Sequence, residues 1–201
     1  QLSLAFGAGL SVHAIDLDRA TADFSQAPAL SESDLVDALR IGWDALDPAS
    51  DLLIVGEMGI GNTTSAAALA AALLGGEVED WAGRGTGVDD AGLARKCAVI
   101  RDGLARHAGL ADHPLRVLQA LGGREIAAMT GAIAHARLAR VPVLLDGFIC
   151  CSAALVLHRL VPGALDHCLA GHVSAEAGHA RLLSALGKEP ILSLGLRLGE
   201  A

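Results

Sequence analysis

The pattern of apolar and polar residues changes sharply within residues 51–74. Residues 52–56 form a short apolar-rich run, residues 57–65 contain glycines and polar side chains, and alanine and leucine dominate from there to residue 74. This order predicts a buried strand, a tight loop and a helix. Asn62, Thr63 and Ser65 are residue types that commonly cap a helix or occupy its first turn.

The same pattern analysis predicts alternating strands and helices along the rest of the chain. Strands are predicted at residues 11–17, 51–57, 141–146 and 167–173. Helices are predicted from Ser31 to just before Pro48, after Asp89 and Asp90, over 114–121, 123–139 and 148–160, and from Ser174 through Leu186. Strands that alternate with helices favour parallel pairing through right-handed crossovers. We therefore expect one α/β domain over residues 1–201, with a doubly wound, mostly parallel sheet flanked by helices.

The loop at residues 56–61 suits an anion. Gly59 and Gly61 allow a phosphate to approach the backbone, and the first N–H groups of the following helix lack partners within it. Glu57 would repel a phosphate, so a functional Glu57 should face a different part of the ligand. An ordinary loop before a helix is the alternative interpretation, because glycine-rich loops are weak motifs.

Two further positions have both a structural and a functional interpretation. Lys96 lies on the helix that follows a second glycine-rich cluster at residues 83–87, and it is either a solvated surface residue or a clamp for an anion. Asp146 ends a predicted strand, so it could cap the next helix, contact a ligand, or do both. Ligands of open α/β sheets bind beyond the carboxyl ends of the strands.

Composition and charge limit the class of partner. Hydrophobic residues make up 52% of the chain but aromatic residues only 2%, so the core must be built from small aliphatic side chains. The net charge of −8 argues against nucleic acid or an anionic membrane surface as the main partner. The sequence shows neither an apolar run long enough to span a membrane nor a signal peptide.

The cysteines and histidines show no metal-site spacing. Four cysteines without C-x-x-C spacing indicate reduced thiols, and we expect a cytoplasmic protein. The eight histidines are scattered, so we expect no metal, and the sequence indicates no cofactor.

Six motifs, in one order, carry a resemblance to a known family. They are GEMGIGNTTSAAAL (56–69), GRGTGVDDAGLARK (83–96), LGGREIAAMTGAI (121–133), VPVLLDGF (141–148), GHVSAEAGH (171–179) and LSLGLRLGE (192–200). Together they resemble nicotinate-nucleotide–dimethylbenzimidazole phosphoribosyltransferase, a family of cobalamin lower-ligand synthesis. The resemblance covers most of residues 51–200, and it implies a Rossmann-like large domain and a homodimer.

The resemblance also implies a reaction. Nicotinate mononucleotide would give its phosphoribosyl group to 5,6-dimethylbenzimidazole with inversion at the anomeric carbon, which yields α-ribazole 5′-phosphate and nicotinate. The attacking base must lose its ring proton, and the family's general base falls on Glu200. Apolar neighbours such as Leu196 and Leu198 would raise the pKa of that carboxyl by desolvation. Glu57 matches a second carboxylate that would stabilise positive charge on the ribose or assist the base.

Other positions match the binding residues of the family. The positions that match the nucleotide site are Gly59, Gly61, Asn62, Gly85, Lys96, Asp146, Ser174, Arg197 and Gly199. The side chains proposed as walls for the flat acceptor base are Met58, Phe148 and Leu198.

The resemblance leaves two alternatives open. Family members are commonly about half as long again, with an upstream segment at the acceptor pocket and a C-terminal segment in a small helical domain, so we expect this chain to be part of a longer one. One alternative is a related transferase that uses the same nucleotide with another acceptor, such as adenine, another benzimidazole or a phenol. The other is a non-catalytic nucleotide-binding homologue, although Glu57 and Glu200 argue against it because binding alone requires neither carboxylate.

Overall fold

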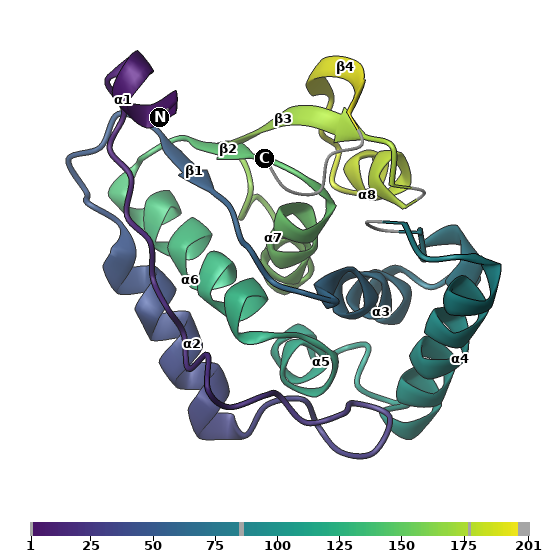
Figure 1. Ribbon diagram of the computed structural model, residues 1–201. Coiled ribbons are helices and arrows are strands. Elements are labelled where there is room, and N and C mark those ends of the chain that lie inside the picture. The colour runs from purple at the N-terminus through teal and green to yellow at the C-terminus, as the bar shows by residue number, and fades with distance from the viewer. Residues whose placement is uncertain (1, 85–86, 177, 197–201) are drawn as a thin grey trace.

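The centre of the structure is a parallel sheet of four strands. The computed structural model describes residues 2–84, 87–176 and 178–196 (Figure 1). The strands are β1 (Leu53–Val55), β2 (Val143–Leu145), β3 (Cys168–Ser174) and β4 (Pro190–Leu196), and they lie in the order β1-β2-β3-β4. Each adjacent pair is parallel, so all four carboxyl ends lie at one edge of the sheet.

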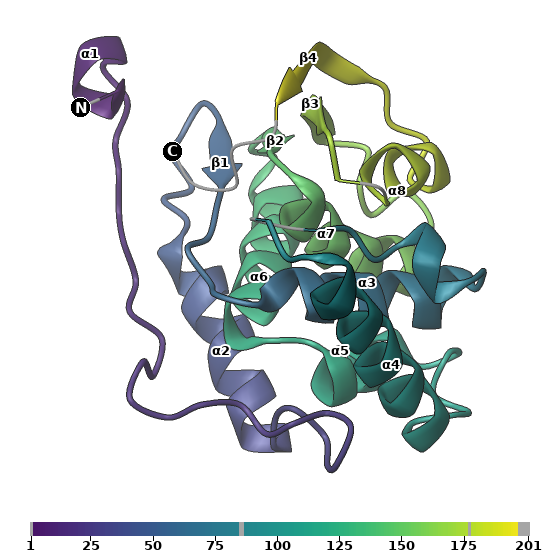
Figure 2. The same ribbon diagram turned by 45° about the vertical axis from the view of Figure 1, so that its right-hand side comes forward.

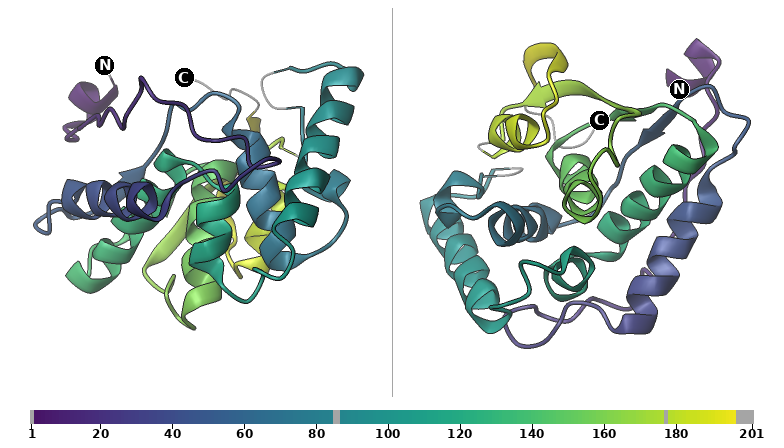
Figure 3. Two further views of the ribbon diagram at one scale, coloured as in Figure 1. Left: turned by 90° about the horizontal axis from the view of Figure 1, so that it is seen from below. Right: turned by 180° about the vertical axis from the view of Figure 1, so that it is seen from behind.

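Helices pack beneath this sheet and beside one another. They are α2 (Glu32–Ala45), α3 (Asn62–Leu74), α4 (Asp90–Arg106), α5 (Pro114–Leu121), α6 (Arg124–Ala139), α7 (Phe148–Leu160) and α8 (His179–Ala185), with a 3₁₀ turn at Val78–Asp80. The short helix α1 (Leu2–Phe6) lies apart from them (Figure 2). In Figure 1, α6, α7 and α3 lie below the strands, whereas α2 and α4 form the two flanks. The views from below and from behind show α2 and α6 running side by side (Figure 3).

The strands follow the alternation that burial on one face requires. Val55, Val143, Leu145 and Ala170 point into the helical layer and are buried. Ile54 and Leu169 point the other way and are 60% and 57% exposed. One face of the sheet therefore contributes to the core, and the other presents apolar side chains.

Most of the predicted elements are confirmed. The α/β class, the parallel sheet flanked by helices, three of the four predicted strands, and the helices at 114–121, 123–139 and 148–160 are present. Ser31 caps α2 and forms the capping box with Asp34. Asp89 caps α4 by accepting the N–H of Gly92 at 2.7 Å.

Two predicted elements are wrong, and one strand is additional. Residues 11–17 alternate in polarity but form no strand; within the described residues they join no sheet ladder, and Val12 and Leu17 are exposed. Figure 2 shows this part of the chain running apart from the sheet. Ser174 does not start a helix, because it is the last residue of β3 and α8 begins only at His179. Strand β4 was not predicted because Pro190 and Gly195 weaken its strand pattern.

Close approach of α2 and α6 depends on two glycines. An ideal Cβ on Gly42 would lie 1.7 Å from the carbonyl oxygen of Ala128, and one on Gly131 would lie 2.0 Å from that of Leu39. The nearest atoms at both positions belong to the backbone of the facing helix, so the two helices would have to separate to accommodate a methyl group.

We expect Gly42→Ala and Gly131→Ala each to lower the free energy of unfolding by about 3 kcal/mol, because overpacking against backbone cannot be relieved by a rotamer change. Urea unfolding followed by circular dichroism measures the change. Gly9→Ala is the matched control, since nothing lies within 4 Å of its Cβ position. Equal stability of all three variants would contradict this account of the packing.

Candidate functional site

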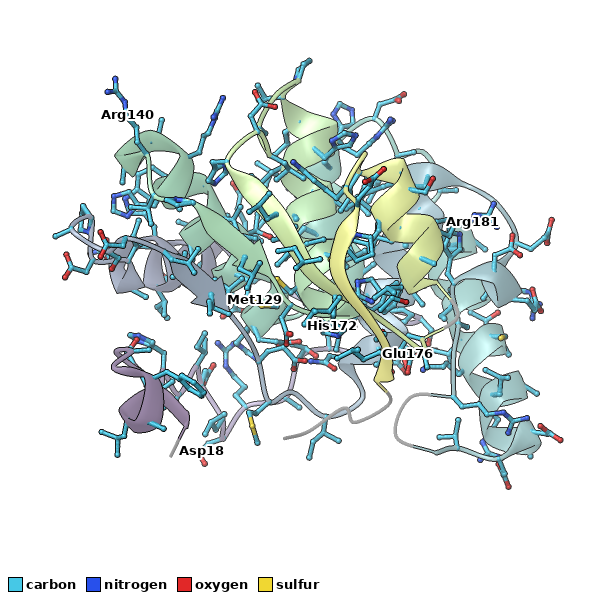
Figure 4. The ribbon with its side chains drawn as sticks, turned by 90° about the horizontal axis from the view of Figure 1, so that it is seen from above. Asp18, Met129, Arg140, His172, Glu176 and Arg181 are labelled. Atoms are coloured by element: carbon cyan, nitrogen blue, oxygen red, sulfur yellow. The ribbon has the colours of Figure 1, made fainter. Side chains whose placement is uncertain are left out.

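Polar residues gather where the parallel strands end. Glu57 lies in the loop after β1, Asp146 follows β2, and Ser174 ends β3. Parallel pairing brings these three segments to the same edge of the sheet. Figure 4 shows His172 and Glu176 beside the arrowhead ends of β3 and β4, at this edge.

The loop after β1 is organised around the Glu57 carboxylate. One carboxylate oxygen accepts the backbone N–H of Gly59 at 2.6 Å and the side-chain amide of Asn62 at 2.5 Å. A Cβ on Gly59 would lie 2.3 Å from that amide nitrogen, so glycine is required for the contact. The Glu57 carboxylate therefore organises its own loop.

The start of α3 has no side-chain cap. Its N-cap is Gly61, with a φ of +79°, and no side chain accepts its first N–H groups. Asn62, Thr63 and Ser65 lie in the first turn, as predicted, but none of them is the N-cap, and the amide of Asn62 binds Glu57. A helix start without a side-chain cap retains backbone donors for an anion.

Lys96 reaches from α4 to the start of α3. Its ammonium donates to the hydroxyl of Thr63 at 2.8 Å and to the carbonyl of Gly83 at 2.9 Å. Burial lowers the pKa of Lys96 below its ordinary value, an effect that the Glu176 carboxylate opposes. Lys96 is thus not a solvated surface residue, and it joins the start of α3 to the second glycine-rich cluster.

Asp146 and Phe148 occupy the turn between β2 and α7. The Asp146 carboxylate lies 3.4 Å from Nδ1 of His172, and most of its side chain is exposed. Asp146 does not cap α7, whose N-cap is Gly147 without a side-chain bond. Phe148 is buried, with its ring inclined at 62° to that of His179, whereas Met58 is 80% exposed.

Ser174 contacts a histidine that the sequence pattern did not single out. Both its N–H and its hydroxyl oxygen lie 2.9 Å from Nδ1 of His179, and the other ring nitrogen lies 3.5 Å from Sγ of Cys151. Burial, with a smaller contribution from His172, lowers the pKa of His179 to about 4. His172 and His179 both lie in the motif at 171–179, and this motif is the sequence feature that could have pointed to them.

Five predicted site residues lie outside the described residues, and their geometry stays a prediction. They are Gly85, Arg197, Leu198, Gly199 and Glu200.

Two surface hollows lie away from this edge. One, of about 460 Å³, lies between Pro28 and Ala120, and the other, of about 510 Å³, lies between Asp16 and α2.

Across residues 2–84, 87–176 and 178–196, no three histidine, cysteine or acidic side chains form a group that could hold a metal ion. In the same part of the chain, no helix is long and apolar enough to cross a membrane.

The arrangement combines an uncapped helix start, a half-buried lysine and carboxylates at one sheet edge. Comparison with known proteins agrees with that combination, because the family described as phosphoribosyltransferase matches residues 2–201. The chain belongs to the phosphoribosyltransferase family. This membership confirms the family resemblance carried by the six motifs.

Individual relatives of this phosphoribosyltransferase chain are similar over its whole length. It is 65% identical over 201 residues to a protein of Roseobacter denitrificans and 66% identical over 200 residues to one of a Ruegeria species, both named nicotinate-nucleotide–dimethylbenzimidazole phosphoribosyltransferase. The chain spans 59% of the length of each. A crystal structure of CobT from Thermus thermophilus matches with a TM-score of 0.81 and 44% identity, over 90% of this chain and 55% of that one.

The buried His179 should make the stability of this chain depend on pH. The native state keeps the imidazole neutral down to about pH 4, whereas the unfolded chain binds a proton near pH 6.5. Stability should therefore be complete above pH 6.5 and fall as the pH drops toward 4. We expect about 2 kcal/mol less stability at pH 5 than at pH 7.5 from this group alone.

Urea unfolding at the two pH values measures this effect. The matched variant is His179→Asn, which cannot titrate in this range, and it should lose correspondingly less stability on acidification. An equal loss in both proteins would mean that His179 is not the group responsible.

Proposed function

We propose that the full-length protein transfers the phosphoribosyl group of nicotinate mononucleotide to 5,6-dimethylbenzimidazole. The products would be α-ribazole 5′-phosphate and nicotinate. The observation that carries the proposal is the meeting, at one sheet edge, of the uncapped start of α3, Lys96 and the Glu57 carboxylate. The names of the relatives support the same substrates.

The binding of the nucleotide would divide between two glycine loops. The N–H groups at the start of α3 and the ammonium of Lys96 are donors that suit the 5′-phosphate. Gly59, Gly61, Asn62 and Gly85 would line this part of the site. Asp146, Ser174, Arg197 and Gly199 would contact the rest of the nucleotide.

The chemistry requires a base and stabilisation of positive charge. The bond from the anomeric carbon to nicotinate breaks, a bond to the acceptor nitrogen forms, and the acceptor's ring proton moves to a carboxylate, for which we propose Glu200. Glu57, held by Gly59 and Asn62, would lie on the ribose side and stabilise its developing positive charge. Met58, Phe148 and Leu198 would bound the acceptor.

We expect two variants to separate binding from chemistry in the full-length protein. Glu200→Gln should lower turnover by about 10³-fold or more and leave nucleotide affinity within a few-fold, because it removes only the base. Lys96→Gln should weaken nucleotide binding by about tenfold to a hundredfold, because it removes a half-buried cation from the phosphate. Nicotinate release and isothermal titration calorimetry measure the two effects.

The outcomes distinguish the alternatives. Release that requires dimethylbenzimidazole supports the proposal, and release only with adenine or a phenol would identify a related transferase with another acceptor. Nucleotide binding without release for any of these acceptors would indicate a non-catalytic homologue. Absence of binding would contradict the nucleotide site itself.

We also propose a cytoplasmic homodimer. The four cysteines are buried free thiols, which suits a reducing compartment. Val36 on α2 and Leu138 on α6 expose apolar side chains that suit a subunit interface. Light scattering of the full-length protein should give twice the mass of one chain, and a monomer at micromolar concentration would contradict the dimer.

A further inference from the structure

His179 is a fully buried polar side chain that the proposed chemistry does not use. It is the first residue of α8, and its ring has no exposed surface. The rings of Phe148 and His172 approach it edge to face, with centroids 6.3 and 5.9 Å away. A buried imidazole without partners would be costly, so its contacts should explain why it is there.

The contacts of His179 fix its tautomer. The backbone N–H of Ser174 can only donate, and it lies 2.9 Å from Nδ1, so Nδ1 must accept. The Ser174 hydroxyl, at 2.9 Å from the same nitrogen, can then only donate to it, so the two donors share the single lone pair of Nδ1. The ring proton therefore resides on Nε2, which faces Sγ of Cys151 at 3.5 Å. The lowered pKa of the imidazole is consistent with this neutral form.

The backbone next to His179 packs tightly against Trp81 and Phe148. A Cβ on the preceding Gly178 would lie 3.0 Å from the carbonyl oxygen of Trp81 and 3.1 Å from the Phe148 ring. Trp81 in turn donates its indole N–H to Gly75 at 2.8 Å, and the guanidinium of Arg181 lies 4.9 Å from its ring centroid. The imidazole thus projects toward Ser174 from a tightly packed support.

Ser174 lies where the sheet ladder becomes irregular. The register between β3 and β4 is regular from Ala170 to His172 and then shifts, so that Ser174 lies opposite Leu196. The N–H of Ser174 is bonded to His179 at this point. The N–H and the hydroxyl of Ser174 are therefore oriented by one side chain, at the ligand edge of the sheet.

We propose that His179 is a positioning residue that holds the backbone and hydroxyl of Ser174 in place for the nucleotide. This inference rests on the proposed function, because Ser174 is one of the residues assigned to the nucleotide. His179 acts through Ser174 and touches no substrate. Its loss should weaken nucleotide binding and leave the chemical step much less affected.

Two substitutions at this position keep opposite halves of the imidazole. His179→Asn places an amide oxygen near the position of Nδ1 and retains an acceptor for Ser174. His179→Gln places an amide nitrogen near Nε2 and retains only the group that faces Cys151. The larger Gln fills the core better, so a role in packing alone would favour Gln over Asn.

The experiment measures nicotinate mononucleotide affinity and steady-state kinetics in the full-length protein. We expect His179→Gln to raise Kd and KM about tenfold with kcat changed less than about threefold, and His179→Asn to stay within about threefold of the wild type. Cys151→Ala is the matched control and should leave Kd within about twofold, because it removes only the partner of Nε2. Thermal unfolding shows which variants are folded at the assay temperature.

A second measurement does not depend on the nucleotide. Nitrogen-15 NMR of labelled histidine at pH 7 should show His179 with Nδ1 unprotonated and Nε2 protonated. Protonation at Nδ1 would overturn the inference even if every variant failed to fold. Equal Kd values for Asn and Gln would overturn it while leaving the proposed function intact, whereas a wild-type protein that binds no nucleotide would overturn both.

Discussion

Parallel pairing of β1, β2 and β3 is the constraint on which the site depends. The paired segments of β1 and β2 are only three residues long, and their register places Val55 beside Leu145. Because Leu145 is in turn paired with Ala170, the loops after β1 and β2 and the end of β3 converge from segments that are far apart in sequence. A shift of one residue in either ladder would move Glu57, Asp146 or Ser174 away from the others and turn the adjacent side chains to the opposite face.

The polar groups at this edge are mostly held by one another. The Glu57 carboxylate accepts hydrogen bonds from Asn62 and Gly59. The Lys96 ammonium donates to Thr63 and Gly83, and the N–H of Ser174 donates to His179. No buried side-chain nitrogen or oxygen among the described residues lacks a hydrogen-bond partner. Such preorganisation means that a ligand would meet groups already oriented, and less conformational entropy would be lost on binding.

The sequence predicted what local patterns encode. Helices α2, α5, α6 and α7 have strong apolar periodicity or clear boundary residues, and their predicted ranges agree with the structure. The segment at 11–17 shows the limit of this approach, because alternation describes a strand only where a neighbouring strand exists to pair with it.

The site shows the same limit in another form. Motifs located Glu57, Lys96 and Asp146, yet the contacts of Lys96 with Thr63 and Gly83 join residues up to 33 positions apart and depend on how α4 packs against α3. His179 was overlooked because the motif at 171–179 indicates neither the burial of its histidines nor their contacts. Its role became visible only when both ring nitrogens had partners.

The alanine-rich helix α3 reverses the usual sensitivity of a protein core to mutation. Residues 66–71 of this helix are all buried, and five of these six are alanines. Truncation can remove only a single methyl group from a buried alanine, whereas a larger side chain needs room in a core that is already packed. The mutational tolerance of this helix is therefore asymmetric: a smaller side chain leaves only a methyl-sized gap, whereas a larger one forces the packing around it to open.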